Sequence, residues 1–129
     1  MWTLEVPTHR RTTFVDVTRD VAALVRDSGD GVVLVYVPHT TAGVTINENA
    51  DPSVRDDLEM ALEHLVPPDL PFTHAEGNSD AHTKASLMGS SVSVPVQGGA
   101  LQLGTWQGIY FAEFDGPRRR RVTVTFTHA

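Results

Sequence analysis

The sequence contains no cysteine and only one lysine, and no stretch approaches the roughly 20 consecutive apolar residues that cross a bilayer. Without cysteine the fold uses no disulfide, and a zinc site would have to use His, Asp or Glu. The N-terminal residues lack the continuous apolar segment of a signal peptide. We therefore expect a cytoplasmic protein that has no membrane partner.

Positive charge is scarce and unevenly placed. Four of the ten basic residues form one run, residues 118–121, so the other six face sixteen acids and the formal net charge is -6. Such an acidic remainder argues against nucleic acid as a partner. Strand alternation would send Arg118 and Arg120 to one side and Arg119 and Arg121 to the other. One pair would then face a phosphate or an acidic helix of a neighbouring subunit, or the run protects an edge strand from aggregation.

The polarity pattern predicts a chain rich in strands. Residues 3–7 and 12–18 alternate with period two, which leaves open whether they pair, and residues 43–48 form a further short strand. The dense β-branched run at residues 31–39 predicts a central strand that is buried on both faces. From residue 91 onward, alternating segments and glycine-containing turns predict the remaining strands.

Three segments carry helix signals. Residues 18–29 begin with Thr18 as the expected N-cap, and residues 51–65 begin with the stronger pair Asp51 and Pro52. Residues 80–88 predict a short helix that ends at Gly89. Together these elements indicate an α+β fold in a single domain over residues 1–129. We expect a two-layer β-sandwich or a curved mixed sheet, with two or three flanking helices.

Three histidines are candidates for catalytic chemistry. His39 follows Pro38 at the end of the most apolar strand, and His74 and His82 flank the stretch "HAEGNSDAH". Three neutral imidazoles that converge would make a metal site with an open position for water or substrate. The spacing matches no established metal motif, so the alternative is that each histidine is an ordinary hydrogen-bonded loop residue.

Acidic and amide residues lie between these histidines. Glu76 and Asp80 are candidates for a general acid or base, or for partners that orient the imidazoles, and Asn78 is a candidate for substrate binding. The alternative is loop chemistry, in which Asn78 turns the chain and Asp80 caps the helix. The two interpretations are compatible, because a capping residue can also orient a ligand.

Other polar residues suggest a ligand site. Lys84 and Ser86 fall in the first turns of the short helix, where free amides hold phosphate, although the sequence is not a Walker A loop. Thr41, Asn47 and Glu48 cluster around two strand ends, and their alternative role is turn and cap chemistry.

An aromatic candidate lies in "GTWQGIY", where a tryptophan stands between two glycines. Trp106 would stack on a flat heterocycle, with Gln107 bonding its edge. The alternative for Trp106 is a place in the core or in a subunit contact.

Four long motifs together resemble one known family. They are "HTTAGVTINENADPSVRDDL", "H-x-EGNSDAH-x-KASLMGSSVSVPV", "LGTWQGIYFAEFDGPRRRR" and "VTVTF". From about Thr12 onward, the chain is similar to the YjbQ-like family, whose members also carry the name secondary thiamine-phosphate synthase. The resemblance implies an α+β domain that assembles as a homotrimer. It also implies a divalent metal, zinc, at His39, His74 and His82.

The activity implied by the resemblance joins a hydroxymethylpyrimidine diphosphate to a thiazole phosphate and releases diphosphate. Lys84 and one arginine pair would stabilise the leaving group. Diphosphate departure usually uses oxygen-coordinated magnesium, so magnesium is the alternative metal. Two other functions stay open: metal-assisted hydrolysis of a small phosphorylated or carbonyl metabolite, and a non-catalytic module that binds a small anionic metabolite.

Overall fold

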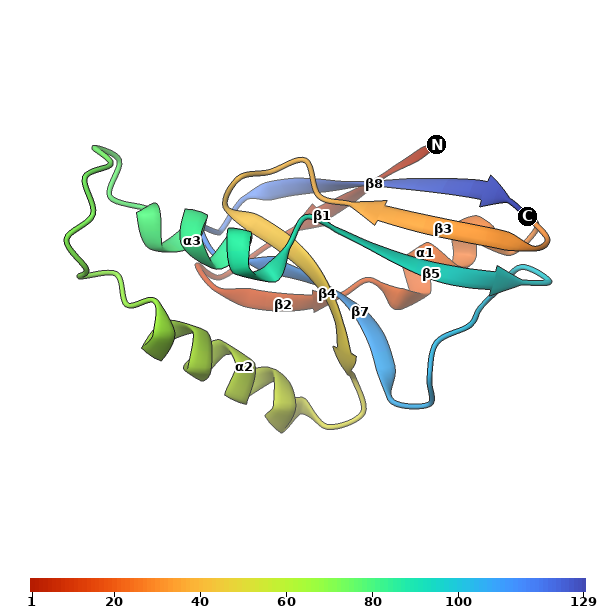
Figure 1. The fold of residues 1–129 in the computed structure, drawn as a ribbon, viewed down its shortest axis with the longest axis horizontal. Coiled ribbons are helices and arrows are strands. Elements are labelled where there is room, and N and C mark those ends of the chain that lie inside the picture. The colour runs from red at the N-terminus through yellow and green to blue at the C-terminus, as the bar shows by residue number, and fades with distance from the viewer.

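A computed structural model describes residues 1–129 and contains eight strands and three helices (Figure 1). Along the chain the elements are β1 (Trp2–Pro7), β2 (Thr13–Asp16), α1 (Thr18–Val25), β3 (Gly31–Tyr36), β4 (Ala42–Glu48), α2 (Pro52–Leu65), α3 (Ser79–Met88), β5 (Ser91–Gln97), β6 (Ala100–Leu101), β7 (Gln107–Glu113) and β8 (Arg119–His128). The predicted α+β class is therefore confirmed. No helix has both the length and the apolar character needed to span a membrane.

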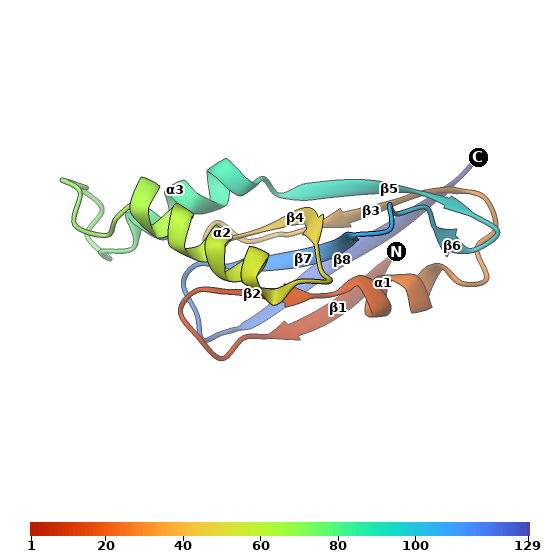
Figure 2. The same cartoon turned by 90° about the horizontal axis from the view of Figure 1, so that it is seen from below.

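The strands form two sheets, an outer one in the order β1-β8-β3-β5-β6 and an inner one in the order β2-β7-β4. Every neighbouring pair of strands is antiparallel. Of the two predicted architectures, the structure therefore has the two-layer sandwich and not the curved mixed sheet. The first two strands do not pair with each other, because β1 joins β8 and β2 joins β7. Figures 1 and 2 place α2 and α3 together at one end of the molecule and α1 toward the other.

Two hydrophobic clusters hold these layers together. The larger one fills the space between the sheets and includes Val33 of β3 and Ile109 and Phe111 of β7. The smaller one packs the opposite face of the inner sheet, with Tyr110 of β7, against Ala81 of α3. Because alternate residues of β7 belong to different clusters, β7 is the strand that is buried on both faces.

The prediction that residues 31–39 are buried on both faces is therefore wrong, although β3 is central in its sheet. Val33 and Val35 are fully buried, whereas Val32, Leu34 and Tyr36 are exposed. The cause is the layer order: the outer sheet has the core on one side and nothing of this chain on the other. A run of β-branched residues thus marks a central strand without fixing how many of its faces are covered.

The helix ends follow the local signals closely. Asp51 caps α2 by accepting a hydrogen bond from the Ser53 amide at 2.9 Å. Helix α3 ends at Gly89, whose φ of 96° favours glycine. Thr18 is not a cap but the first residue of α1. Its hydroxyl accepts a hydrogen bond from the Ile109 amide at 2.8 Å, which fixes α1 to β7.

Candidate functional site

His39 takes its position from the proline before it. The register of β3 against β8 pairs Tyr36 with Thr123, and its continuation sets Pro38 opposite Arg121. Pro38 has no N–H, so the ladder stops there and the backbone groups of Arg121 need another partner. The His39 ring supplies it, with Nε2 lying 3.1 Å from both the amide nitrogen and the carbonyl oxygen of Arg121.

The surroundings of His39 keep its ring neutral. Burial lowers the pKa of His39 below the usual 6.5, and the positive charge of Arg120 lowers it further. When Nε2–H donates to the Arg121 carbonyl, Nδ1 keeps a free lone pair, which is the usual arrangement of a metal-bound histidine. When Nε2 instead accepts from the Arg121 amide, Nδ1 carries the proton and becomes a donor.

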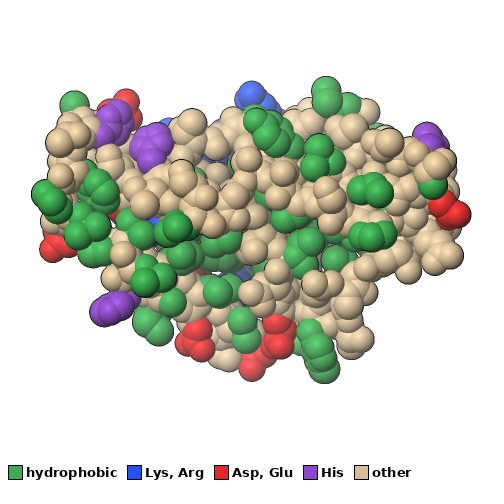
Figure 3. Space-filling view, in the orientation of Figure 1, with side chains coloured by type: hydrophobic (Ala, Val, Ile, Leu, Met, Phe, Trp, Pro, Cys, Tyr) green, Lys and Arg blue, Asp and Glu red, His purple; other side chains and the backbone are tan.

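The other two candidate histidines lie next to each other. His74 is in the loop before α3 and His82 is in α3, and their ring centroids are 5.4 Å apart in an edge-to-face arrangement. Figure 3 shows two neighbouring histidine side chains on the surface at the α3 end of the molecule. Both rings line the same cleft as His39, so the structure brings the three histidines together.

We call this hollow of about 480 Å³ the histidine cleft. It is formed by the segment after β3, the loop before α3, the first turn of α3 and the β7–β8 connection. Its wall is entirely polar except for one proline, and its residues are Pro38, His39, Thr40, Thr41, His74, Glu76, Asn78, His82, Asp115, Arg118 and Arg120. An adjoining hollow shares His39 and His82 and also includes Ser86, whose hydroxyl bonds the His82 carbonyl.

One wall of the histidine cleft contains an ionised carboxylate. Burial raises the pKa of Asp115, but hydrogen bonds from Asn78 and Arg118 outweigh it and leave the pKa below the usual range. The Asn78 amide donates to Asp115 at 2.9 Å, and Arg118 Nη2 donates at 3.1 Å. The carbonyl oxygen of Asn78, Oδ1, is buried and has no hydrogen-bond partner.

Arg120 lines the cleft together with Arg118, the residue with which strand alternation pairs it in the sequence. Its guanidinium forms a buried ion pair with Glu113 and donates to the Thr41 hydroxyl at 2.8 Å. Thr41, predicted to bind substrate, therefore orients this arginine. The alternation of residues along β8 indicates that Arg120 points inward. Arg119 and Arg121 are exposed on the outer face of β8, whereas Arg120 lies in the inward row with Val122.

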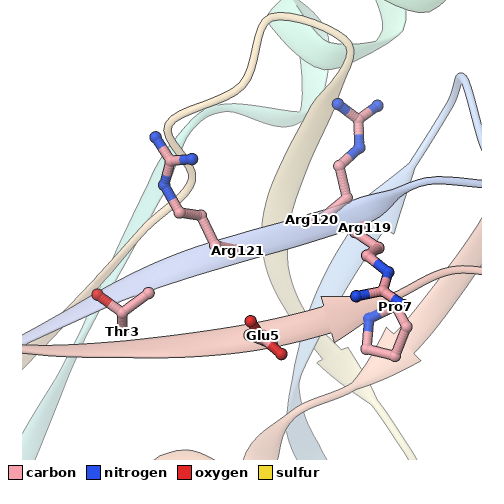
Figure 4. A pocket seen from close by; sticks show the side chains of 6 residues that line it. All are labelled: Thr3, Glu5, Pro7, Arg119, Arg120 and Arg121. Carbon is pink, nitrogen blue, oxygen red and sulfur yellow. The ribbon is translucent and has the colours of Figure 1, made fainter.

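The two exposed arginines form a separate hollow on the outer face of the five-stranded sheet. Figure 4 shows Arg119 reaching toward Pro7 at the end of β1, whereas the Arg120 and Arg121 side chains extend from β8 away from β1. This hollow of about 410 Å³ contains no histidine. It lies on the opposite side of β8 from the inward row that holds Arg120.

Asp80 and Lys84 do not reach the histidine cleft. Both side chains are 1% exposed, and they form a closed network under α3. Arg11 donates to both oxygens of Asp80 at 3.0 and 3.1 Å, and Lys84 bonds Glu63. Burial raises the pKa of Asp80, but the hydrogen bond and charge of Arg11 more than offset it. The charges assigned to catalysis and phosphate binding are thus paired inside the protein.

Four further candidates lie at the far end of the inner sheet. Thr41 precedes β4 and Glu48 ends it, a span of roughly 20 Å for an extended chain. Glu48 pairs with Gln107 in the inner sheet, and Asn47 precedes Glu48 in β4. None of these three residues lines the histidine cleft, and Trp106 does not line it either. Trp106 is 62% exposed, which excludes a place in the core.

The residues present meet the metal prediction only in part. Three imidazoles share one cleft, and neutral imidazole nitrogen is a good ligand for zinc. However, no three His, Asp or Glu side chains are arranged as a metal-binding group. The donor chemistry therefore fits a divalent cation, while the set of three ligands is not assembled.

Comparison with known proteins gives one consistent result. Residues 2–129 match the family model described as UPF0047 protein YjbQ-like. The UPF0047 protein MJ1081 of Methanocaldococcus jannaschii is 53% identical, over 93% of this chain and 88% of its own. UPF0047 protein YugU of Bacillus subtilis is 50% identical, over 92% of each chain.

Solved structures agree with these sequence matches. An uncharacterised conserved protein of the YjbQ/UPF0047 family from Clostridium acetobutylicum has a TM-score of 0.96 and 49% identity, covering 98% of this chain and 100% of that one. A conserved hypothetical protein from Thermus thermophilus has a TM-score of 0.93 and 44% identity, over the same shares.

Proposed function

The chain belongs to the UPF0047 family of YjbQ-like proteins, and we propose that its histidine cleft is the active site of a small metal-dependent enzyme acting on a phosphorylated metabolite. The observation that carries this proposal is the meeting of three imidazoles with Arg118 and Arg120 in one polar cleft. Imidazoles supply metal ligands or proton carriers, and arginines supply donors to phosphate oxygens.

His74 and His82, with Nδ1 of His39, are the atoms that would hold the cation. A bound zinc or magnesium ion would supply a Lewis acid next to the substrate. Glu76 lines the cleft and is exposed, so it is our candidate for moving a proton. Asp115, kept ionised by its hydrogen bonds, orients Asn78 and Arg118 from the cleft wall.

The leading reaction is the one that the family resemblance implies, the joining of a pyrimidine diphosphate to a thiazole phosphate. The cleft offers arginines for the phosphates, whereas Trp106 lies too far away to stack on the heterocycle in the same site. That placement favours the second candidate, metal-assisted hydrolysis of a smaller phosphorylated or carbonyl metabolite. The third candidate, a binding module without turnover, is favoured by the lack of an assembled group of three ligands.

Self-association is part of the proposal. Val32, Leu34 and Tyr36 form an exposed apolar strip in the middle of the outer sheet, and such strips commonly lie in protein interfaces. We expect three copies, on the strength of the resemblance, and cytoplasmic location stays a prediction. Analytical ultracentrifugation tests the assembly: wild type should sediment as a trimer and Leu34→Lys as a folded monomer. A monomeric wild type would contradict it.

The metal is tested by its content per chain in protein purified without a histidine tag. Wild type should contain nearly one zinc per chain, and the His74→Ala, His82→Ala double variant should contain none. The matched control removes two histidines outside the cleft, His64 and His128, and should keep the metal. A wild type that stays metal-free after incubation with zinc and with magnesium would overturn the metal-dependent function.

The reaction is tested on the same samples. Diphosphate release from the pyrimidine diphosphate and thiazole phosphate pair would support the synthase, and release of phosphate from simple phosphate esters would support the hydrolase. Either activity should disappear in the double variant and survive in the control. Ligand binding without turnover under either assay would leave the binding module as the function.

A further inference from the structure

Arg120 is the buried cation of the histidine cleft, with only 7% of its surface exposed. A guanidinium has five N–H donors on three nitrogens. Nε and Nη2 donate to Glu113, and Nη2 also donates to Thr41. Nη1 makes no hydrogen bond within the protein, yet it is not among the buried atoms that lack a partner. Arg120 lines the cleft, and Nη1 is the guanidinium nitrogen left free to donate to a ligand there.

Glu113 fixes the direction in which this guanidinium points. Glu113 is fully buried and accepts hydrogen bonds from the Thr8 hydroxyl at 2.7 Å and from the Phe114 and Asp115 amides at 3.1 and 3.2 Å. A carboxylate held from so many sides cannot turn, and neither can the arginine that it binds. The free nitrogen is thereby a preorganised donor, which loses little freedom when it binds an oxyanion.

We propose that Arg120, positioned by Glu113 and Thr41, binds a phosphate oxyanion of the ligand in the histidine cleft. Phosphate and phosphate monoesters present the oxygens that a guanidinium binds through its N–H donors. The inference deepens the proposed function, since it concerns the same cleft, but it does not depend on a metal ion.

Isothermal titration calorimetry with inorganic phosphate tests the proposal, on protein as purified and after treatment with a chelator. Wild type should bind phosphate in both states. Arg120→Lys keeps the positive charge but loses the planar set of N–H donors of the guanidinium, and should weaken phosphate binding about tenfold. The matched control Arg119→Lys, one residue away on the outer face, should bind as wild type does.

A milder variant covers the case in which Arg120→Lys fails to fold. Thr41→Val keeps a branched side chain but removes one anchor of Arg120, and should weaken phosphate binding severalfold. Unchanged phosphate affinity in a folded Thr41→Val protein would overturn the proposal, as would a wild type that does not bind phosphate.

The metal-dependent function and the role of Arg120 can be overturned by different results. Phosphate binding in a wild type that never takes up metal would overturn the metal-dependent function and leave the role of Arg120 standing. Metal uptake without any phosphate binding would overturn the role of Arg120 alone. An equal loss of phosphate binding in Arg119→Lys and Arg120→Lys would show that the loss is not specific to the cleft arginine and would also overturn it.

Discussion

Arg120 and Lys84 are both almost fully buried, and each is paired with a buried carboxylate, Glu113 in one network and Asp80 in the other. The difference lies in what remains unpaired. Arg120 keeps one nitrogen free to donate to a ligand in the histidine cleft, whereas the Lys84 ammonium is bonded to Glu63 and stays outside the cleft. Burial with a partner can therefore prepare a cation for a ligand or remove it from use, and the free donors decide which.

The largest effect is expected from breaking the Arg120 network. Glu113→Gln keeps the side-chain shape but leaves Arg120 as a buried charge without a partner, which should cost about 3–5 kcal/mol of the free energy of unfolding. Urea unfolding followed by circular dichroism measures the loss. The double variant Glu113→Leu, Arg120→Met should lose less than the single variant, because no buried charge remains. The reverse order would contradict the interpretation of Glu113 as the partner that compensates Arg120.

A smaller effect is expected from the Lys84 network. Lys84→Met removes the ammonium, but Asp80 keeps both hydrogen bonds from Arg11, and Glu63 is half exposed to water. The free energy of unfolding should fall by about 2 kcal/mol, the order of hydrogen bonds to charged groups. Phosphate affinity should not change. A loss of phosphate binding in a folded Lys84→Met protein would show that Lys84 takes part in ligand binding. Lys84 would then not differ from Arg120 in this respect.

The pH dependence of stability tests the cleft side of the comparison. Hydrogen bonds from Asn78 and Arg118 leave the pKa of Asp115 below its usual 3.8 despite burial. Its contribution to stability is therefore complete above the unfolded pKa and is lost as pH falls through the lower folded value. In unfolding measured from pH 6 to pH 2, Asp115→Asn should show a shallower fall below about pH 4 than wild type. An identical profile would mean that Asp115 is not held ionised by its partners.

Local signals in the sequence were enough to predict α2 and α3, of which α3 lines the cleft. The Asp51–Pro52 pair begins α2, and Gly89 ends α3, because a cap or a positive φ is a property of a few neighbouring residues. The bend after β3 was visible too, since Pro38 cannot continue a ladder. These signals also place His39 just beyond the end of a central strand, where binding residues are common.

The order of the layers and the partners of the buried side chains could not be predicted from the sequence, because they depend on residues that are far apart in the chain. Val33 and Phe111 belong to strands of similar composition, and only the packing of α3 on the inner sheet makes β7 the strand covered twice. The partner of Lys84 is Glu63, twenty-one positions earlier in another helix. A periodic pattern indicates which residues share a face, but it does not indicate which distant carboxylate that face will meet.

The smallest effect is expected from an ion pair that is not buried. Arg10 lies 3.2 Å from Glu59 with 65% of its side chain exposed, so water screens the attraction and the arginine loses conformational freedom by holding it. Arg10→Gln should change the free energy of unfolding by less than about 0.5 kcal/mol and leave phosphate affinity unchanged. Arg11, its neighbour, makes two hydrogen bonds to the buried Asp80, and Arg11→Gln should cost several times more in the same urea titration. Equal losses in the two variants would show that burial of the carboxylate does not determine the strength of these ion pairs. Burial would then give no reason to expect larger effects at Arg120 and Lys84 than at the other eight of the ten basic residues.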